Sequence, residues 1–137
     1  MVEGTHSMIA WDESVSSGIE EIDLQHKEFF KIIQRLQILN DKGSGKDFTL
    51  RILQELVKYT EYHFISEENL MILTKYPSIE HHQLEHKKLL RSLNYWIQAF
   101  EDGNEKLAAL LSFLASWLTS HTKSEDCRIG EYLNSRP

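Results

Sequence analysis

The sequence contains very little cysteine and proline. Cys127 is the single cysteine among 137 residues, so the chain cannot form a disulfide within itself, which suits a reducing compartment. Proline occurs only at positions 77 and 137, and the glycines lie mostly outside the stretches with regular apolar spacing. This shortage of helix breakers favours long helices and argues against an all-β fold. A chain of this length can bury a substantial core, and we predict one domain over residues 1–137.

Long apolar runs and basic clusters are also missing. No apolar run approaches the roughly 20 residues that a membrane span needs, and the N-terminus lacks the apolar segment of a signal peptide. The formal net charge is −6, and Lys and Arg never cluster beyond a pair. These features argue against nucleic acid and membrane surfaces as partners and predict a cytoplasmic protein.

Apolar residues recur every three or four positions in four separate stretches, which is the spacing of one helix face. The predicted helices run from Ile19 to the loop sequence NDKGSGKD, from Phe48 to Leu73, from Ile79 to Phe100 and from Leu107 to His121. Loops of roughly four to seven residues join them, so neighbouring helices must run antiparallel. We therefore predict an all-α fold, an up-down-up-down antiparallel four-helix bundle. We also predict a non-helical N-terminal arm, in which residues 1–8 form a flexible leader and Trp11 packs on the bundle. A short C-terminal helix is predicted over 127–134.

Polar residues interrupt the apolar face of every predicted helix. They are His26, His63, Glu67, His82, His86 and His121. Burying a carboxylate and several imidazoles without partners is costly, and a shared cation removes that cost. The pairs His63/Glu67 and His82/His86 are four residues apart, so each pair lies on one helix face and can bind one metal centre. His81 lies about 100° around the helix from His82, and we expect it at the surface.

The last predicted helix is irregular after His121. The apolar pattern resumes at Ile129 and Leu133 in phase with Asp126, as though one residue had been inserted. A local bulge between His121 and Asp126 would direct both side chains inward, and such bulges are common at functional sites. The alternative is that Asp126 caps the short C-terminal helix.

Five histidines and two carboxylates exceed the ligand needs of one ion, and the chain has no set of thiolates for structural zinc. Imidazoles with bridging carboxylates suit a pair of iron ions, and the core of a four-helix bundle is a known place for such a pair. The Glu-x-x-His pattern of ferritin-like sites is absent from the four predicted helices. A ligand set rich in neutral histidine favours reversible O₂ binding over substrate oxidation, which predicts a binding protein and not an enzyme.

With these residues in place, the sequence resembles the bacterial hemerythrins over nearly all of residues 9 to 134. The matching segments are WDES, GIEEIDLQH, HFISEE, PSIEHHQLEH and WLTSHTKSED. The resemblance implies two irons bridged by Glu67, Asp126 and an oxo or hydroxo group. It assigns His82, His86 and His121 to one iron, and His26 and His63 to the other, which keeps an open position for O₂.

The resemblance leaves two roles open, an O₂ carrier or store and the O₂-sensing domain of a larger signalling protein. A di-iron peroxidase or oxidase that uses the open position is the alternative. We expect an apolar wall beside this position, formed by Ile22, Phe29, Phe30, Tyr59, Trp117 and Leu118.

Three residues near the predicted ligands are unusual for this family. Thr122 replaces an aliphatic residue, and its hydroxyl either bonds a carbonyl one turn back or holds a water near the O₂ position. Ile129 stands where many relatives have tyrosine. Cys127 is either a small half-buried hydrophobe or a redox-sensing thiol.

Overall fold

The computed structural model describes residues 16–43 and 45–135, so the predictions for the leader 1–8 and for Trp11 lie outside the described residues. The helices are α1 (Glu20–Lys42), α2 (Lys46–Thr74), α3 (Ile79–Glu101), α4 (Leu107–His121) and α5 (Cys127–Asn134). A π-helical segment, Thr122–Asp126 (η2), joins α4 to α5. The described residues contain no strand, and the predicted all-α fold is confirmed.

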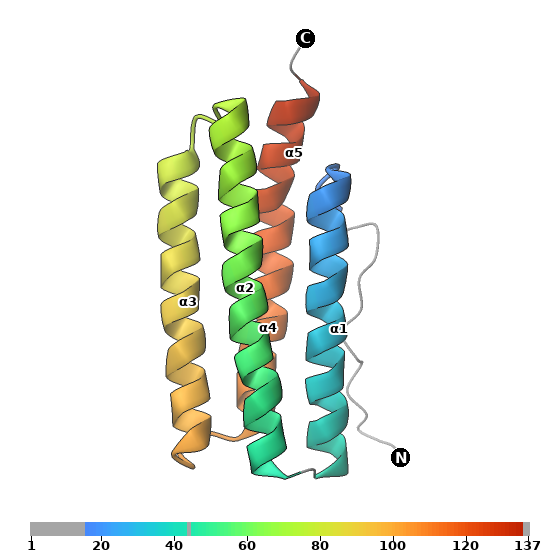
Figure 1. The fold of residues 1–137 in the computed structure, drawn as a ribbon, viewed down its shortest axis with the longest axis vertical. Helices are drawn as coiled ribbons and strands as arrows, with labels where there is room; N and C mark the ends of the chain where they lie inside the picture. The colour runs from blue at the N-terminus through green and yellow to red at the C-terminus, as the bar shows by residue number, and fades with distance from the viewer. Residues whose placement is uncertain (1–15, 44, 136–137) are drawn as a thin grey trace.

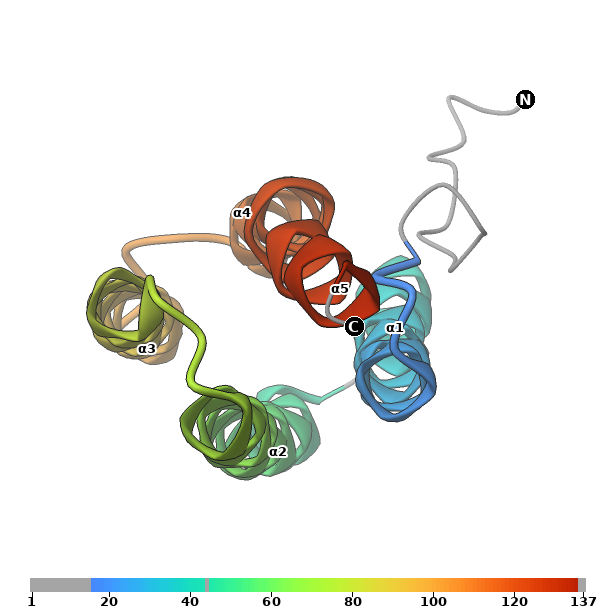
Figure 2. The same cartoon turned by 90° about the horizontal axis from the view of Figure 1, so that it is seen from above.

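The four long helices form an antiparallel bundle in which the chain runs down, up, down and up (Figure 1). Seen from above, α1, α2, α3 and α4 follow one another around the bundle (Figure 2), and contacts join each helix to the next and α4 back to α1. The short helix α5 continues beyond α4 and lies toward the start of α1. The predicted topology is therefore confirmed, including the short C-terminal helix.

Backbone conformation ends the first two helices. Gly43 adopts a left-handed φ of 65° after α1, and its N–H donates to the carbonyl of Asn40 over 3.3 Å. Lys75 takes the same role after α2, with φ 58°, and Pro77 follows it. Ser78 stands at the N-cap of α3, and its side chain makes no capping bond.

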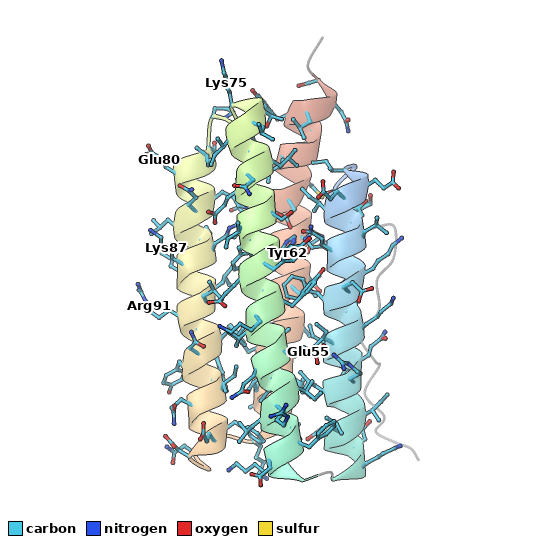
Figure 3. The ribbon with its side chains drawn as sticks, in the orientation of Figure 1. Glu55, Tyr62, Lys75, Glu80, Lys87 and Arg91 are labelled. Atoms are coloured by element: carbon cyan, nitrogen blue, oxygen red, sulfur yellow. The ribbon has the colours of Figure 1, made fainter. Side chains whose placement is uncertain are left out.

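Two apolar clusters form the core, and both exclude charge. The larger cluster includes Leu36, Leu53, Leu56 and Leu114, each 1% exposed or less. The smaller one contains Met71, Tyr76 and Ile129. Charged side chains such as Glu80, Lys87 and Arg91 point away from the bundle (Figure 3).

The predicted polar residues occupy the level between these clusters. Along α2, for example, Leu53 and Leu56 precede His63 and Glu67, and Met71 follows them. Apolar packing therefore closes this level of the bundle on both sides. Within the described part of the chain, every helix is too short or too polar to cross a membrane.

Candidate metal centre

The structure brings all seven predicted site residues into one buried cluster. α1 contributes His26, α2 His63 and Glu67, α3 His82 and His86, α4 His121, and the π segment Asp126. Their side chains are at most 6% exposed. The four helices and the bulge thus converge on a single polar site inside an otherwise apolar core.

The π segment is the local structure that brings both His121 and Asp126 into the site. The two residues are five positions apart, a spacing that a regular α-helix would place on different faces. The wider π-helical turn over Thr122–Asp126 turns both inward, and Asp126 is completely buried. The predicted bulge is confirmed. Asp126 makes no side-chain capping bond to α5, so the capping alternative is wrong.

The histidines divide into two sets, each completed by carboxylates. One group that can hold a metal ion consists of Glu67, His82, His86 and His121, and the other of His26, His63, Glu67 and Asp126. Within each group the potential ligand atoms lie within 4.8 Å of one another. Every histidine directs its Nε2 toward a carboxylate, which leaves Nδ1 facing outward.

The two carboxylates connect the two histidine sets. Glu67 Oε1 lies 2.5 Å from His82 Nε2 and 3.1 Å from His86 Nε2. The other oxygen of Glu67, Oε2, lies 3.3 Å from His63 Nε2. Each oxygen of this one carboxylate therefore faces a different set of histidines.

Asp126 repeats this arrangement from the other side. Its Oδ2 lies 2.8 Å from His26 Nε2, and its Oδ1 lies 3.2 Å from His121 Nε2 and 3.4 Å from His82 Nε2. Two carboxylates that each divide their oxygens between the same two sets can bridge a pair of cations.

Several of these buried atoms lie close to one another without being hydrogen-bonded. Both oxygens of Asp126, Oε2 of Glu67 and Nε2 of His121 have no hydrogen-bond partner among the described residues. The facing histidine nitrogens are only 2.8–3.3 Å from the carboxylate oxygens, yet these pairs do not form hydrogen bonds. A buried polar atom without a partner costs about 1–3 kcal/mol. A cation bound by each of the two ligand groups would satisfy these atoms, so the donor set fits two metal ions.

The charges inside the cluster compensate one another in the absence of metal. Burial acts to raise the pKa of Glu67, but the facing imidazoles of His121, His63, His82 and His86 hold it well below its usual range. Burial acts to lower the pKa of His82 and His121, but Asp126 and Glu67 raise these values to about 9 and about 10. Metal ions would therefore displace protons from these two imidazoles on binding.

Two residues that the sequence reasoning missed orient the histidines from outside. Gln25 Oε1 lies 2.6 Å from His63 Nδ1, and the Gln25 amide donates to Ser66 Oγ over 2.9 Å. Glu68 Oε2 lies 2.8 Å from His86 Nδ1. Such partners set the tautomer and ring orientation of a ligating histidine. The one sequence signal was that Gln25 and Glu68 are adjacent in the chain to His26 and Glu67.

Aromatic rings pack directly on the histidine rings. Phe64 stacks on His86 at a centroid distance of 3.8 Å, and Trp117 stacks on His121 at 5.7 Å. Phe29 meets His63 edge to face at 5.3 Å. Of the predicted apolar wall, the structure places Phe29 and Trp117 against these histidines, and Tyr59 against Phe29. Phe64 was missed because its position next to His63 lies off the predicted apolar face.

The remaining histidine of α3, His81, lies at the surface as predicted. Its side chain is 55% exposed, and its Nε2 is 3.3 Å from Glu125 Oε1. Glu85 is close to both, but Lys88 and Arg128 already pair with the two carboxylates. Surface ion pairs therefore explain why these exposed side chains lie together.

Thr122 and Cys127 differ in how their polar atoms are used. Thr122 is completely buried, and its Oγ1 has no hydrogen-bond partner among the described residues. The alternative in which this hydroxyl bonds a carbonyl one turn back is therefore wrong. Cys127 Sγ donates to the carbonyl of Ser16 over 3.3 Å, and burial together with the nearby Asp126 charge raises its pKa. A raised pKa disfavours the reactive thiolate, which favours the structural role.

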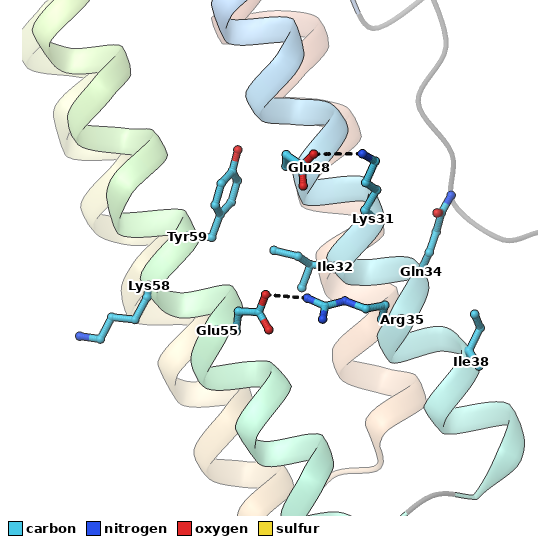
Figure 4. Close-up of a pocket in the computed structure, with 9 residues that line it drawn as sticks. All are labelled: Glu28, Lys31, Ile32, Gln34, Arg35, Ile38, Glu55, Lys58 and Tyr59. Atoms are coloured by element: carbon cyan, nitrogen blue, oxygen red, sulfur yellow. Dashed lines mark hydrogen bonds and ion pairs between the residues drawn. The ribbon is translucent and has the colours of Figure 1, made fainter.

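A groove on the outside of the bundle does not belong to this cluster. It encloses about 780 Å³ between α1 and α2 and contains none of the seven residues (Figure 4). The ion pair between Arg35 and Glu55, with a 2.7 Å separation, crosses it.

Comparison with known proteins agrees with the fold and with the residue pattern. Residues 17–133 match the family model of the hemerythrin HHE cation binding domain. The bacteriohemerythrin of Pseudomonas paraeruginosa is 30% identical over 120 residues, which cover 86% of this chain and 76% of that protein. The bacteriohemerythrin of Campylobacter jejuni is 28% identical over 126 residues, covering 91% and 95%. A solved structure of wild-type hemerythrin matches with a TM-score of 0.81 and 25% identity, covering 94% of this chain and all of that one (100%). The chain therefore belongs to the hemerythrin family, in its bacterial branch.

Proposed function

We propose that this chain is a non-haem di-iron protein that binds O₂ reversibly. The observation that carries the proposal is the placement of Glu67 and Asp126, each with one oxygen toward each set of histidines. Membership of the hemerythrin family supports the choice of iron over other cations that accept imidazole and carboxylate ligands. The bound iron pair supplies the electrons and the open coordination position that O₂ binding requires.

In this proposal the two metal positions have unequal numbers of ligands. His82, His86 and His121 would hold one ion, and His26 and His63 would hold the other. The position with two histidines would thus keep room for O₂, and an oxo or hydroxo group would belong to the same centre. Near it, Phe29 is 1% exposed and packs edge to face on His63, so an apolar ring covers this side of the site.

The apolar side chains of the predicted wall favour ligand binding over catalysis. Ile22, Phe29 and Leu118 are at most 2% exposed and offer no acid or base. Substrate oxidation usually needs a positioned proton donor or acceptor. We therefore assign the chain to O₂ carriage or storage, or to O₂ sensing within a larger signalling protein.

The proposal is tested by metal analysis and O₂ titration of protein produced with iron. We expect close to two irons per chain. We also expect that O₂ added to the anaerobically reduced protein produces a new visible absorption that argon removes. A content near one iron, or mostly zinc, would contradict the di-iron assignment. Irreversible oxidation with turnover of a peroxide substrate would favour the enzyme alternative.

Two adjacent histidines of α3 provide a matched pair for testing the ligand assignment. His82→Ala removes a buried imidazole that faces both carboxylates, and we expect it to lose iron or to change the visible spectrum. His81→Ala removes an exposed imidazole and should leave both unchanged. Iron analysis and absorption spectra of the two variants check this, and equal behaviour would show that the assignment on α3 is wrong.

Thr122 provides a test of water near the O₂ position. Thr122 directly follows His121, and its buried hydroxyl has no protein partner in the described chain, so it is available to hold a water molecule beside the proposed centre. A proton source favours decay of the O₂-bound form to the ferric form. We expect Thr122→Val, which keeps the volume and removes the hydroxyl, to slow this decay several-fold without changing iron content.

The decay is followed by the absorption of the O₂-bound protein at one temperature and pH. Thr119→Val, the same change at a half-buried position of α4, is the matched control and should behave as the wild type. An unchanged or faster decay in Thr122→Val would rule out this hydroxyl as the proton source.

A further inference from the structure

Residues 16–19, here called the strap, enter α1 through a network centred on one carboxylate. Ser16 Oγ donates to Asp23 Oδ2 over 2.6 Å. The backbone N–H and the hydroxyl of Ser17 donate to Asp23 Oδ1 over 2.7 and 2.8 Å. Asp23 lies in the first turn of α1, three residues before His26. The strap is therefore attached to the part of α1 that carries a site histidine.

The other side of the strap is in backbone contact with α5. A Cβ atom placed on Gly130 would lie 1.6 Å from the carbonyl oxygen of Ser17 and 2.8 Å from its carbonyl carbon. No side chain larger than hydrogen fits there, because real Cβ contacts essentially never fall below 3.0 Å. Cys127 adds the Sγ bond to Ser16, and Gly18 turns the strap with a φ of 82°.

The strap thus joins α1, which contains His26, and α5, which follows Asp126. α5 begins directly after Asp126, and it lies toward the start of α1 (Figure 2). Across this junction, His26 Nε2 and Asp126 Oδ2 are 2.8 Å apart. The strap bonds to α1 one turn before His26 and contacts α5 one turn after Asp126.

We propose that the strap, closed over Gly130, is a positioning element that holds Asp126 against His26. The inference rests on the proposed function, because that function assigns His26 to the metal position with two histidines and Asp126 to both positions as a bridge. Gly130 and Asp23 are positioning residues, since they act through α5 and α1. The absence of a side chain at position 130 is what lets α5 approach closely enough.

The effect is expected to be selective for one of the two metal positions. Glu67, His82 and His86 stand on α2 and α3, which contact each other directly and not through the strap. Asp126 instead depends on the π segment, whose looser turn yields more easily than an α-helix when α5 is displaced. Asp126 belongs to the ligand group of His26 and His63, whereas Glu67, His82, His86 and His121 form a group of four without it. Displacement should therefore weaken the position of His26 and His63 more than the position with three histidines.

The test is a Co²⁺ titration of metal-free wild-type protein, Gly130→Ala and Gly45→Ala, followed by visible absorption. Gly45 has ordinary backbone angles, and an added Cβ would meet nothing within 4 Å, which makes it a matched control. We expect two Co²⁺ per chain in the wild type and in the control. In Gly130→Ala the first Co²⁺ should bind as in the wild type and the second at least about 10-fold more weakly, a loss typical of groups that orient ligands.

If Gly130→Ala bound both ions with the affinity of the wild type, the inference would be overturned. Equal weakening at both positions would also overturn it, because that result would indicate general destabilisation. A wild-type protein that binds fewer than two ions would instead contradict the proposed function.

Asp23→Ala is the second variant, for the case in which Gly130→Ala does not fold by circular dichroism. It removes three strap hydrogen bonds and adds no atom. The same selective loss of the second Co²⁺ is expected, with exposed Glu21→Ala as its control. Unchanged binding of the second ion by Asp23→Ala would overturn the role of the strap.

Discussion

Replacing Glu67 by glutamine is expected to abolish binding of both metal ions. Glu67 is the residue common to both candidate metal groups, and its two oxygens face different histidine sets. Glutamine keeps the shape but replaces one oxygen with an amide group that cannot ligate a cation. It also removes the negative charge that partly neutralises two cations. We expect metal affinity to fall more than about 100-fold at both positions, beyond the usual effect of orienting groups.

Iron analysis and Co²⁺ titration of Glu67→Gln measure this loss. The control is Glu61→Gln, the same change on the same helix at a side chain that is 45% exposed and paired with Lys58. The control should retain both ions. If Glu67→Gln retained one ion at wild-type affinity, Glu67 would serve a single metal position and the bridging assignment would be wrong.

Removing the metal by chelation is expected to lower the melting temperature by about 10 °C or more. Two sites saturated 100-fold above their Kd stabilise the native state by about 5 kcal/mol together. For a domain of this size, each kcal/mol corresponds to a few degrees. The metal-free chain should nevertheless remain folded, because His82 and His121 hold protons at neutral pH. Burial opposes those protons, but Asp126 and Glu67 raise the two pKa values to about 9 and about 10.

Circular dichroism melting of the iron-loaded and chelated protein checks this expectation. Adding Fe²⁺ under anaerobic conditions should restore the original melting temperature, whereas Mg²⁺, which prefers oxygen ligands, should not. Glu67→Gln should melt at the same temperature with and without iron. A wild-type melting temperature that did not change on removal of two irons would show that the site contributes no net stability.

Much of the site could be predicted because its residues break a periodic pattern. A histidine such as His26 or His86 in an apolar face stands out against its own helix, and helix geometry relates that face to the bundle core. The same periodicity revealed the bulge, since Ile129 is in phase with Asp126 and out of phase with His121. Local spacing therefore predicted which side chains meet, and the structure brings those side chains together.

Contacts between different helices were not predictable in the same way. Gln25 approaches His63 across 38 positions of the chain, and Glu68 approaches His86 across 18. Both residues lie next to another polar residue in the sequence, and no sequence pattern predicts which histidine each of them contacts. For the hydroxyl of Thr122, the sequence allowed either a bond to a backbone carbonyl or a bound water. Only the tertiary structure showed that it has no partner in the described chain.

By itself, the sequence determined the helices, their antiparallel order, the bulge and the seven inward-facing polar residues. Each of these follows from spacing along one chain segment, where 3.6 residues per turn converts position into direction. Tertiary structure alone decided that the oxygens of Glu67 and Asp126 divide between the two histidine sets, and that Gly130 meets the carbonyl of Ser17. Those contacts depend on the separation and rotation of neighbouring helices, which arise from the packing of all side chains together and have no local signature in the sequence.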